Sequence, residues 1–554
     1  MKEGSSSIAF LLIAFLSMNY FSSALVISVS QRNGTDSTSC LIPNSSQPRT
    51  PCRTLRYAVR ALEEEKNENE TLFSFSIEDQ VYFLDKRINV SQTNRKRRVY
   101  FKAGTSGPRV IIRCHKESSG IEIGAMDPKR PKTRNIFFQD LGFQSCGPHF
   151  TAVVLIWNSV YVSFKNCEFK QNRQAGINAF NSGVAIENCS FIENTSPSTY
   201  NANFATEAYV QGINSTGGGA GFVYHNAENL SLIIKNSIFK SNVAVTDETR
   251  NYILPSFNVS DFPTAGGGMI VLFLGVAKYC QVLIENTVFV NNEATNGGGL
   301  YFAVANMAKG NNLTVINSNF SGNYASQTGG GLGLSQWDNS SNSNILVKNC
   351  LVNENKAKQG GGINVLFMSF NMRKTDSTLR LDSVTFSHNQ GKTVILFSTA
   401  LPRSMKVDVT PELINCSIKN SKLKREEGRL GSLTSQRVNL KFAGENVFHK
   451  NEIGCGAALL HCVIFVHGRL AFINNTGVGT GGALLIIESQ IILFPDTELL
   501  FLGNHVLGMG GAVCVFVSVD ELTHANNPDC FLAYSDPLLP PSKWKTIMWG
   551  IFDN

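Results

Sequence analysis

Charged side chains are scarce in this sequence of 554 residues. Only 16% of the residues are Asp, Glu, Lys or Arg, whereas there are 47 glycines. This composition argues against long solvent-exposed helices and favours short strands joined by many turns. The formal net charge is +7. The two densest basic runs, Arg95–Arg98 and Lys129–Arg134, are either solvated faces or patches for an acidic glycan or another anionic surface.

The sequence also lacks an apolar run long enough to cross a bilayer, which takes about 20 residues. The apolar stretch Ile8–Met18 is shorter, follows Lys2, and precedes a group of small residues. This pattern is typical of a signal peptide, with cleavage expected after Ala24. We therefore predict a protein that is secreted or held at the cell surface, with no membrane span beyond the signal peptide and no nucleic-acid partner.

The chain has 13 cysteines, and in an oxidising compartment nearby pairs would form disulfides. Cys167 and Cys189 occupy equivalent places in KNCEF and ENCSF, so they could lie on neighbouring repeats, either bridged or as two buried thiols. The odd total leaves one cysteine without a partner. The other candidate disulfides are Cys40 with Cys52, Cys455 with Cys462, and Cys514 with Cys530.

Acceptor sites for N-glycosylation, Asn-x-Ser/Thr, are numerous, although a chain rich in Asn and Ser contains some by chance. We therefore predict a glycoprotein without choosing among the sites. The candidate asparagines are Asn33, Asn44, Asn69, Asn89, Asn188, Asn194, Asn214, Asn229, Asn258, Asn312, Asn319, Asn339, Asn415 and Asn474.

A repeat fills most of the chain. Each copy contains Phe-x-x-Asn, and in the cleanest copies Gly-Gly with an apolar or small residue follows, as in Phe289–Leu300. A repeat with a period of roughly thirty residues indicates a stacked array of similar units. Val352 and Ile418 stand where a Phe is expected. Full copies begin at Phe169, Phe191, Phe239, Phe289, Phe320, Phe386, Phe448, Phe472 and Phe501.

Apolar and polar residues alternate within each copy, which is the pattern of a half-buried strand. We therefore predict an all-β fold, a right-handed parallel β-helix with a short N-terminal capping helix. The Phe side chains should point inward and stack from coil to coil. The Asn of each copy should bend the chain in the left-handed conformation, while its amide bonds to the next coil. The glycines should occupy a tight corner.

The predicted segments follow from these patterns. Thr50 can cap the capping helix and Pro51 suits its first position. In order, the segments are a signal peptide (1–24), an N-terminal cap region (25–99) with a helix at 51–65, a β-helix (100–530) with loop insertions near 195–215 and 243–264, and an irregular or truncated C-terminal segment (531–554).

The pairing of Phe-x-x-Asn with Gly-Gly-Ala/Leu/Ile resembles the repeat of the polymorphic outer membrane proteins of chlamydiae. The segment Pro51–Val59 (PCRTLRYAV) is similar to the N-terminal cap of such chains. The resemblance covers roughly Cys40–Asn504. It implies a pectin-lyase-like β-helix, a location at the cell surface and a role in adhesion.

No catalytic or metal-binding motif is recognisable. Glycoside hydrolysis needs paired carboxylates, and those of the repeats, such as Glu168 and Asp382, are irregularly spaced. His461 and His467 straddle an apolar strand without metal-ligand spacing. We predict no catalytic residue, metal or cofactor. The predicted function is non-catalytic adhesion, recognition or matrix assembly, with glycans or cell-surface and matrix proteins as partners. The alternative is a polysaccharide lyase or glycoside hydrolase of the same fold.

Overall fold

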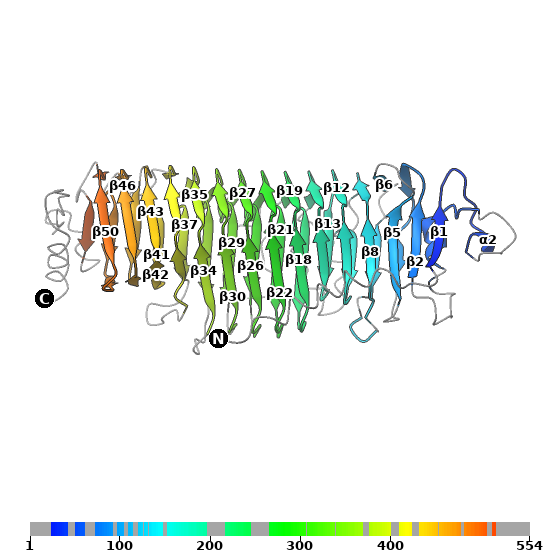
Figure 1. Cartoon of the computed structure of the whole chain (residues 1–554), viewed down its shortest axis with the longest axis horizontal. Coiled ribbons are helices and arrows are strands. Elements are labelled where there is room, and N and C mark those ends of the chain that lie inside the picture. The colour runs from blue at the N-terminus through cyan, green and yellow to red at the C-terminus, as the bar shows by residue number, and fades with distance from the viewer. Residues whose placement is uncertain are drawn as a thin grey trace.

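The computed structural model describes most of the chain as a long shaft of parallel strands (Figure 1). The predicted loop insertions and C-terminal segment lie largely or wholly outside the described residues, as do 1–23 of the signal peptide. The described residues are 24–41, 50–60, 62, 72–91, 97–104, 109–114, 120–125, 127–130, 132–147, 152–196, 217–244, 265–305, 307–337, 340–368, 376–399, 409–423, 431–452, 454–477, 481–506 and 512–516.

The shaft is the predicted right-handed parallel β-helix. One coil runs through β21 (Met269–Leu274) in sheet C, β22 (Gln281–Glu285) in sheet A, β23 (Val288–Val290) in sheet B and β24 (Glu293–Asn296) in sheet D. The next coil starts at β25 (Leu300–Val304), which pairs with β21. Sheet A has 15 strands, sheets B and C have 14 each, and sheet D has seven. Sequence order is therefore also the order along the shaft.

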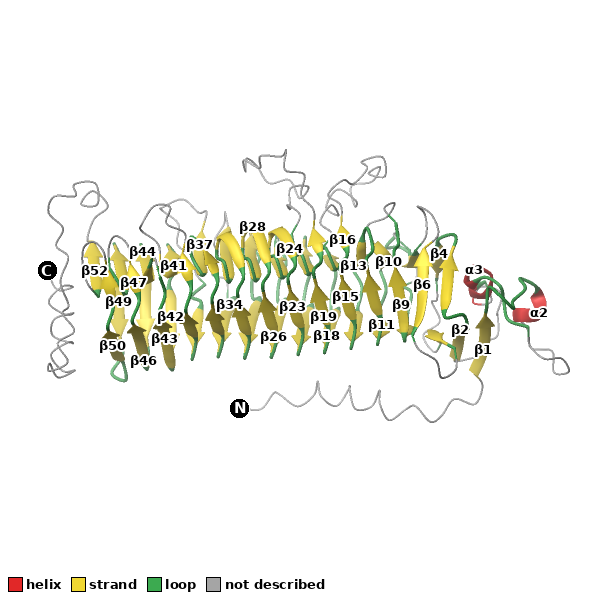
Figure 2. Cartoon of the chain, turned by 90° about the horizontal axis from the view of Figure 1, so that it is seen from above, coloured by secondary structure: helices red, strands yellow, loops and turns green. Residues whose placement is uncertain are grey.

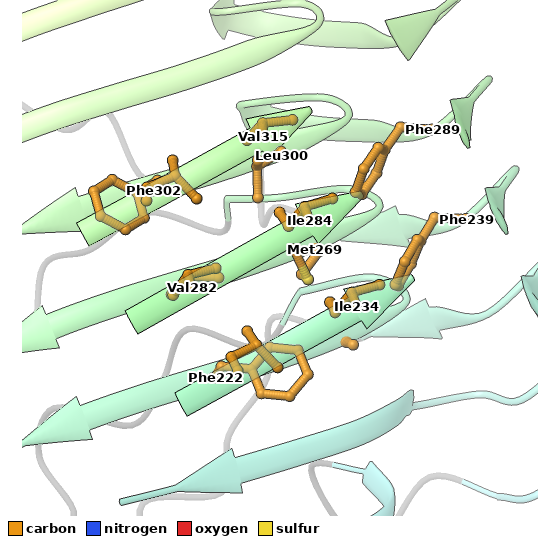
Figure 3. Close-up of a cluster of buried hydrophobic side chains, with 14 of the residues drawn as sticks. Phe222, Ile234, Phe239, Met269, Val282, Ile284, Phe289, Leu300, Phe302 and Val315 are labelled. Carbon is orange, nitrogen blue, oxygen red and sulfur yellow. The ribbon is translucent and has the colours of Figure 1, made fainter. Parts of the chain in front are cut away.

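The phenylalanines of the repeat form one column inside the shaft, as predicted. In Figure 3 the rings of Phe239 and Phe289 lie one above the other, with centroids 4.9 Å apart and planes 7° from parallel. Val352 continues the column, because it pairs in register with Phe320 on one side and Phe386 on the other. All these side chains are fully buried. Most strands of sheet B in the repeat are therefore held in register by the ring on the coil beneath them.

The asparagines of the repeat form a buried ladder beside that column, also as predicted. The Asn292 amide nitrogen donates to Oδ1 of Asn323 (2.9 Å) and to the carbonyl of Phe239 (2.9 Å). Its Oδ1 accepts from the amide nitrogen and the backbone N–H of Asn242, both at 3.0 Å. A side-chain amide offers two donors and two acceptor positions, so Asn292 is completely satisfied while fully buried.

The bend beside the ladder differs from the prediction in one respect. The left-handed residue is not the asparagine of Phe-x-x-Asn but the residue just before it, such as Asn291 (φ +54°) or Gln171 (φ +54°). The ladder asparagine must turn inward, so the exposed residue ahead of it takes the bend. Another left-handed asparagine, such as Asn286 (φ +50°), makes the corner between sheets A and B.

The glycine triplet makes the corner that leads into sheet C. Gly297 has a φ of +61°, which glycine adopts without strain. A Cβ on Gly298 would lie 2.5 Å from the carbonyl oxygen of Gly330 on the next coil. The triplet therefore meets both predicted needs, a positive φ and a close backbone approach.

Two short helices, α2 (Thr38–Leu41) and α3 (Leu55–Val59), lie at the N-terminal end of the shaft (Figure 2). The prediction of a helix over 51–65 was too long at its start, because Thr54 rather than Thr50 caps α3, accepting from the Tyr57 N–H at 3.2 Å. In the part of the chain that the structure describes, no helix has the length and apolarity needed to cross a membrane.

The shaft also begins earlier than predicted. β1 (Ala24–Val29) and β2 (Leu72–Ile77) already belong to sheet A, although they lie at or within the range assigned to the cap region. Their burial explains the difference, because Phe73, Phe75 and Ile77 are fully buried in the same core as the later coils.

The described residues contain two disulfides. Cys40–Cys52, one of the predicted pairs, ties α2 to the segment before α3. Cys114–Cys146 joins neighbouring coils and was not predicted. Cys167 and Cys189 are two buried thiols on neighbouring coils, with the Cys167 N–H donating to the Cys189 sulfur at 3.3 Å.

Cys455 and Cys462 are free and buried, contrary to the predicted bridge. Cys455 begins β44 (Cys455–Leu460) and Cys462 lies beyond its end. A strand rises about 3.3 Å per residue, so the two sulfurs lie much too far apart for a disulfide. Cys514 is fully buried, and its predicted partner Cys530 lies outside the described residues.

The ladder can be tested by removing one rung. Asn292→Ala leaves several buried donors and acceptors of Asn242, Asn323 and Phe239 without a partner, which should lower the free energy of unfolding by about 2–4 kcal/mol. Urea unfolding followed by circular dichroism measures this loss. Asn291→Gly is the matched control, because glycine keeps the left-handed conformation at that exposed position. Equal losses in both variants would contradict a stabilising role for the ladder.

Candidate functional site

The carboxylates named from the sequence are spread along the shaft and paired with basic residues. Glu168 lies 3.3 Å from Arg109, and Asp382 lies 3.4 Å from Lys348 on the preceding coil. Across the described residues, no three His, Cys, Asp or Glu side chains gather closely enough to hold a metal ion.

The two histidines considered in the sequence lie near the C-terminal end of the shaft. Nδ1 of His461 is 2.8 Å from a carboxylate oxygen of Glu488, and the His467 ring stacks on Phe494 at 3.6 Å. Each histidine has its own acidic neighbour, since His467 is 3.7 Å from Asp496. The structure does not bring the two side chains together around one site.

The outward face of sheet A carries an aromatic cluster near the N-terminal end of the shaft. Side chains alternate along β5 (Arg98–Ala103), so Val99 and Phe101 are buried while Tyr100 points outward. The ring of Tyr100 stacks on Phe137 of β8 (Ile136–Gln139), with centroids 4.5 Å apart. The third member, Tyr161, meets Phe137 edge-on at 5.7 Å and is 39% exposed.

Basic side chains surround this cluster. Arg98 and Lys102 flank Tyr100 on the same strand, and Lys165 ends the neighbouring strand β11 (Val162–Lys165). Arg134 follows Thr133, whose carbonyl accepts from the Val160 N–H at 2.9 Å, so Arg134 runs beside Tyr161. We call these residues the basic–aromatic patch: Arg98, Tyr100, Lys102, Arg134, Phe137, Tyr161 and Lys165.

The patch joins two basic runs that are separate in the sequence. Arg98 comes from the run 95–98 and Arg134 from the run 129–134, and the pairing of β5 with β8 puts them on adjacent coils. Arg97 is different, because it is buried with its guanidinium 4.7 Å above the ring of Phe73. One member of the first run therefore stabilises the core, and its neighbour faces solvent.

Part of the positive charge of the patch has no carboxylate close by. Lys165 has Glu187 at 3.8 Å, whereas Lys102 and Arg134 have no carboxylate at ion-pair distance among the described residues. Burial raises the pKa of Tyr161, while the nearby Arg98 charge acts in the opposite direction. The Tyr161 hydroxyl is therefore protonated at neutral pH. The sequence indicated the basic runs but gave no signal that three aromatic rings from separate coils would meet between them.

The candidate glycosylation sites differ in exposure. Asn194 is fully buried as a rung of the asparagine ladder, and Asn312 and Asn319 are half-buried. The exposed candidates are Asn33, Asn89, Asn188, Asn229, Asn415 and Asn474, and those outside the described residues are Asn44, Asn69, Asn214, Asn258 and Asn339.

Comparison with known proteins finds no family model and no curated protein that matches this chain. Three solved structures resemble it in shape. The catalytic domain of a GH87 α-1,3-glucanase has 10% identity and a TM-score of 0.33, with 87% of this chain and 69% of that chain covered. Tailspike protein 3 of bacteriophage CBA120 has 9% identity and a TM-score of 0.34 (96% and 70% covered). A rhamnogalacturonan lyase has 9% identity and a TM-score of 0.23 (87% and 88% covered).

These comparisons correct one prediction. Two of the three structures are a glucanase catalytic domain and a lyase, so the prediction that this chain is not an enzyme is not retained. At such low identities and TM-scores, the likenesses assign no activity to the chain. Any activity has to be argued from its own residues.

The buried acceptor Asn194 gives a test of the ladder in the protein as made by cells. Its amide nitrogen donates to the Phe169 carbonyl and to Oδ1 of Asn242, both at 2.9 Å. A glycan needs that nitrogen and has no room in the core. Glycopeptide mass spectrometry of protein secreted from eukaryotic cells should find Asn194 unoccupied and the exposed Asn188 and Asn415 occupied. A glycan at Asn194 in folded protein would contradict the structure there.

Proposed function

We propose that this chain is a secreted carbohydrate-active β-helix protein that holds an acidic polysaccharide against the basic–aromatic patch. The observation that carries the proposal is the convergence of four cationic side chains around three aromatic rings on three neighbouring coils. Sulfate or carboxylate groups would meet the cations, and arginine binds such groups through two parallel hydrogen bonds.

The charge balance supports an acidic rather than a neutral polysaccharide. Elsewhere on sheet A, charges on neighbouring coils pair with opposite charges, as in Lys235–Glu285 (2.9 Å) and Lys441–Glu412 (2.9 Å). In the patch, Lys102 and Arg134 have no carboxylate at that distance among the described residues. A bound polyanion would supply negative charge to these two side chains.

Among cleavage reactions, the patch suits β-elimination better than hydrolysis. Hydrolysis uses two carboxylates held across the scissile bond, and the patch has cations and a tyrosine instead. In elimination from a uronate, a hydroxide ion from the solvent takes the proton on carbon 5 and becomes water, and the electron pair of that C–H bond forms the C4=C5 double bond. The C4–O bond then breaks, and its oxygen takes a proton. Arg98 and Arg134 would neutralise the uronate carboxylate, and Tyr161 would donate the last proton.

The proposed extracellular location has support in the chain as well. Disulfides persist in oxidising compartments, and both disulfides of the structure lie in the N-terminal part of the shaft, one of them joining neighbouring coils. Six of the glycosylation acceptors are exposed. A secreted protein meets acidic polysaccharides at cell surfaces and in the matrix.

Binding through the patch can be tested by removing its arginines. The double variant Arg98→Gln and Arg134→Gln should bind heparin and polygalacturonate at least about 10-fold more weakly than wild type, because each lost charge contact weakens binding. Wild-type binding should also fall as salt is raised. The control pair Lys170→Gln and Lys240→Gln removes equal charge from sheet B and should change little. Equal binding of uncharged dextran would refute the proposal.

Cleavage by elimination can be tested separately. Tyr161→Phe keeps the ring but removes the hydroxyl, so it should retain binding and lower the turnover rate by about 100-fold. Absorbance of the C4=C5 double bond in the product measures the rate, and Tyr279→Phe, at an exposed corner elsewhere, is the control. Wild type that binds polygalacturonate and heparin but releases no unsaturated product would refute elimination and leave the binding proposal standing.

A further inference from the structure

Within the basic–aromatic patch, two lysines on the outward face of sheet A are separated by an uncharged residue. Lys102 of β5 pairs in register with Gln139 of β8, and Gln139 pairs with Lys165 of β11. The strands β2, β5 and β8 follow one another along the shaft (Figure 1). Lysine, glutamine and lysine therefore form one column along the shaft, which we call the Lys–Gln–Lys column.

The fold sets the spacing of the column. Neighbouring strands of a sheet lie about 4.8 Å apart, so the backbones of Lys102 and Lys165 are about 10 Å apart along the shaft. Each pyranose ring lengthens an extended polysaccharide by a distance similar to one coil. A polysaccharide that lies along the shaft therefore places one sugar over Lys102, the next over Gln139 and the third over Lys165.

The middle position of the column disfavours a negative charge. Nε2 of Gln139 donates to Oδ2 of Asp140 at 2.9 Å, and Oδ1 of Asp140 accepts from Nδ2 of Asn166 at 3.0 Å. The Gln139 amide thus turns its donor toward a carboxylate, and its Oε1 can accept a hydrogen bond from a sugar hydroxyl. Arg134 is on the same coil but precedes β8, at the opposite end of the strand from Gln139. A neutral sugar suits this position better than an acidic one.

The coils on either side of the column also lack a cation. Ser76 of β2 pairs with Lys102, and Glu187 of β14 (Val184–Glu187) pairs with Lys165. The Lys165–Glu187 ion pair is long, at 3.8 Å, and its side chains are 44% and 43% exposed. Such an exposed pair is weak and leaves Lys165 open to a ligand. An acidic sugar beside the one over Lys165 would instead meet the Glu187 carboxylate.

Sheet stability does not explain the column. Farther along the shaft, opposite charges on neighbouring coils form ion pairs, as Lys235 and Glu285 do at 2.9 Å, and such pairs stabilise a sheet. Between Lys102 and Lys165 the residue is an uncharged glutamine, and Lys102 has no carboxylate at ion-pair distance in the part of the chain that the structure describes. The column therefore positions two cations without pairing both of them.

We propose that the patch selects acidic polysaccharides in which charged and neutral sugars alternate, over polysaccharides that are charged on every sugar. This inference rests on the proposed function, because it names the class of polysaccharide that the same patch holds. Lys102 and Lys165 bind the acidic groups of two sugars, and Gln139 accepts a hydroxyl of the neutral sugar between them. Asp140 and Glu187 repel charges at the other positions, which gives selectivity by repulsion.

Two oligosaccharides of equal charge test the selection. One is an oligomer of hyaluronan, in which glucuronate alternates with neutral N-acetylglucosamine, and the other is an oligogalacturonate with the same number of carboxylates. Calorimetric titration of wild type should give a Kd at least about 10-fold lower for the hyaluronan oligomer, because like charges brought together oppose binding of the galacturonate. A surface that responds to charge density alone would prefer the galacturonate.

The variant Gln139→Lys supplies a cation at the middle position. It should shift the ratio of the two Kd values at least about 10-fold toward the galacturonate, because the middle acidic sugar gains a charge-assisted contact. Gln281→Lys is the matched control, since Gln281 is an exposed residue of β22 on the same sheet and lies outside the patch. This control should keep the wild-type ratio, and equal unfolding midpoints establish that both variants are folded.

Two results would overturn the selection. One is wild type that binds both oligomers equally or prefers the galacturonate, and the other is an unchanged ratio in folded Gln139→Lys. The proposed function survives both results if the double variant Arg98→Gln and Arg134→Gln binds both oligomers more weakly than wild type. Wild type that binds neither oligomer overturns the proposed function itself.

Discussion

The fold depends on two contacts that recur from coil to coil along most of the shaft, a stacked ring and a fully bonded amide. A ring such as Phe289 stacks on Phe320 at 4.8 Å, and beside it Asn292 bonds to Asn323 at 2.9 Å. Both contacts are satisfied only when neighbouring coils are in register, since a shift by one residue would turn the strand's buried side chains outward. Hydrophobic packing and hydrogen bonding therefore specify the same register.

Much of this architecture could be predicted, because the repeat in the sequence corresponds to one coil of the shaft. The spacing of Phe289 and Phe320 gives the period of the repeat. The alternation of apolar and polar residues shows which side chains of each strand point into the shaft. The position of the left-handed bend could not be predicted, because spacing does not distinguish Asn291 from Asn292 until the inward hydrogen bonds are known. The Cys455–Cys462 bridge was wrong for a related reason, since neighbours in sequence are far apart along an extended strand.

The candidate site was much less predictable than the fold. Arg98 and Arg134 belong to basic runs that the sequence showed, but their meeting depends on the pairing of β5 with β8. Tyr161 gave no sequence signal at all, because it lies outside the repeated motif. The residues at outward positions can vary without disturbing the core. The repeat therefore predicts the shaft but not which side chains gather on its surface.

Within the repeat, from Phe169 to Asn504, one coil lacks both stabilising contacts. In β39 (Ser417–Lys419) the ring position is held by Ile418, and Ser421 stands where the ladder asparagine would be. Its hydroxyl turns back to the Lys419 carbonyl, at 3.2 Å, so the amide chain that ends at Asn389 resumes only at Asn451. We expect the rod to behave mechanically as two stiff segments with a weaker joint between them. A pull along its axis would part the molecule at this coil first.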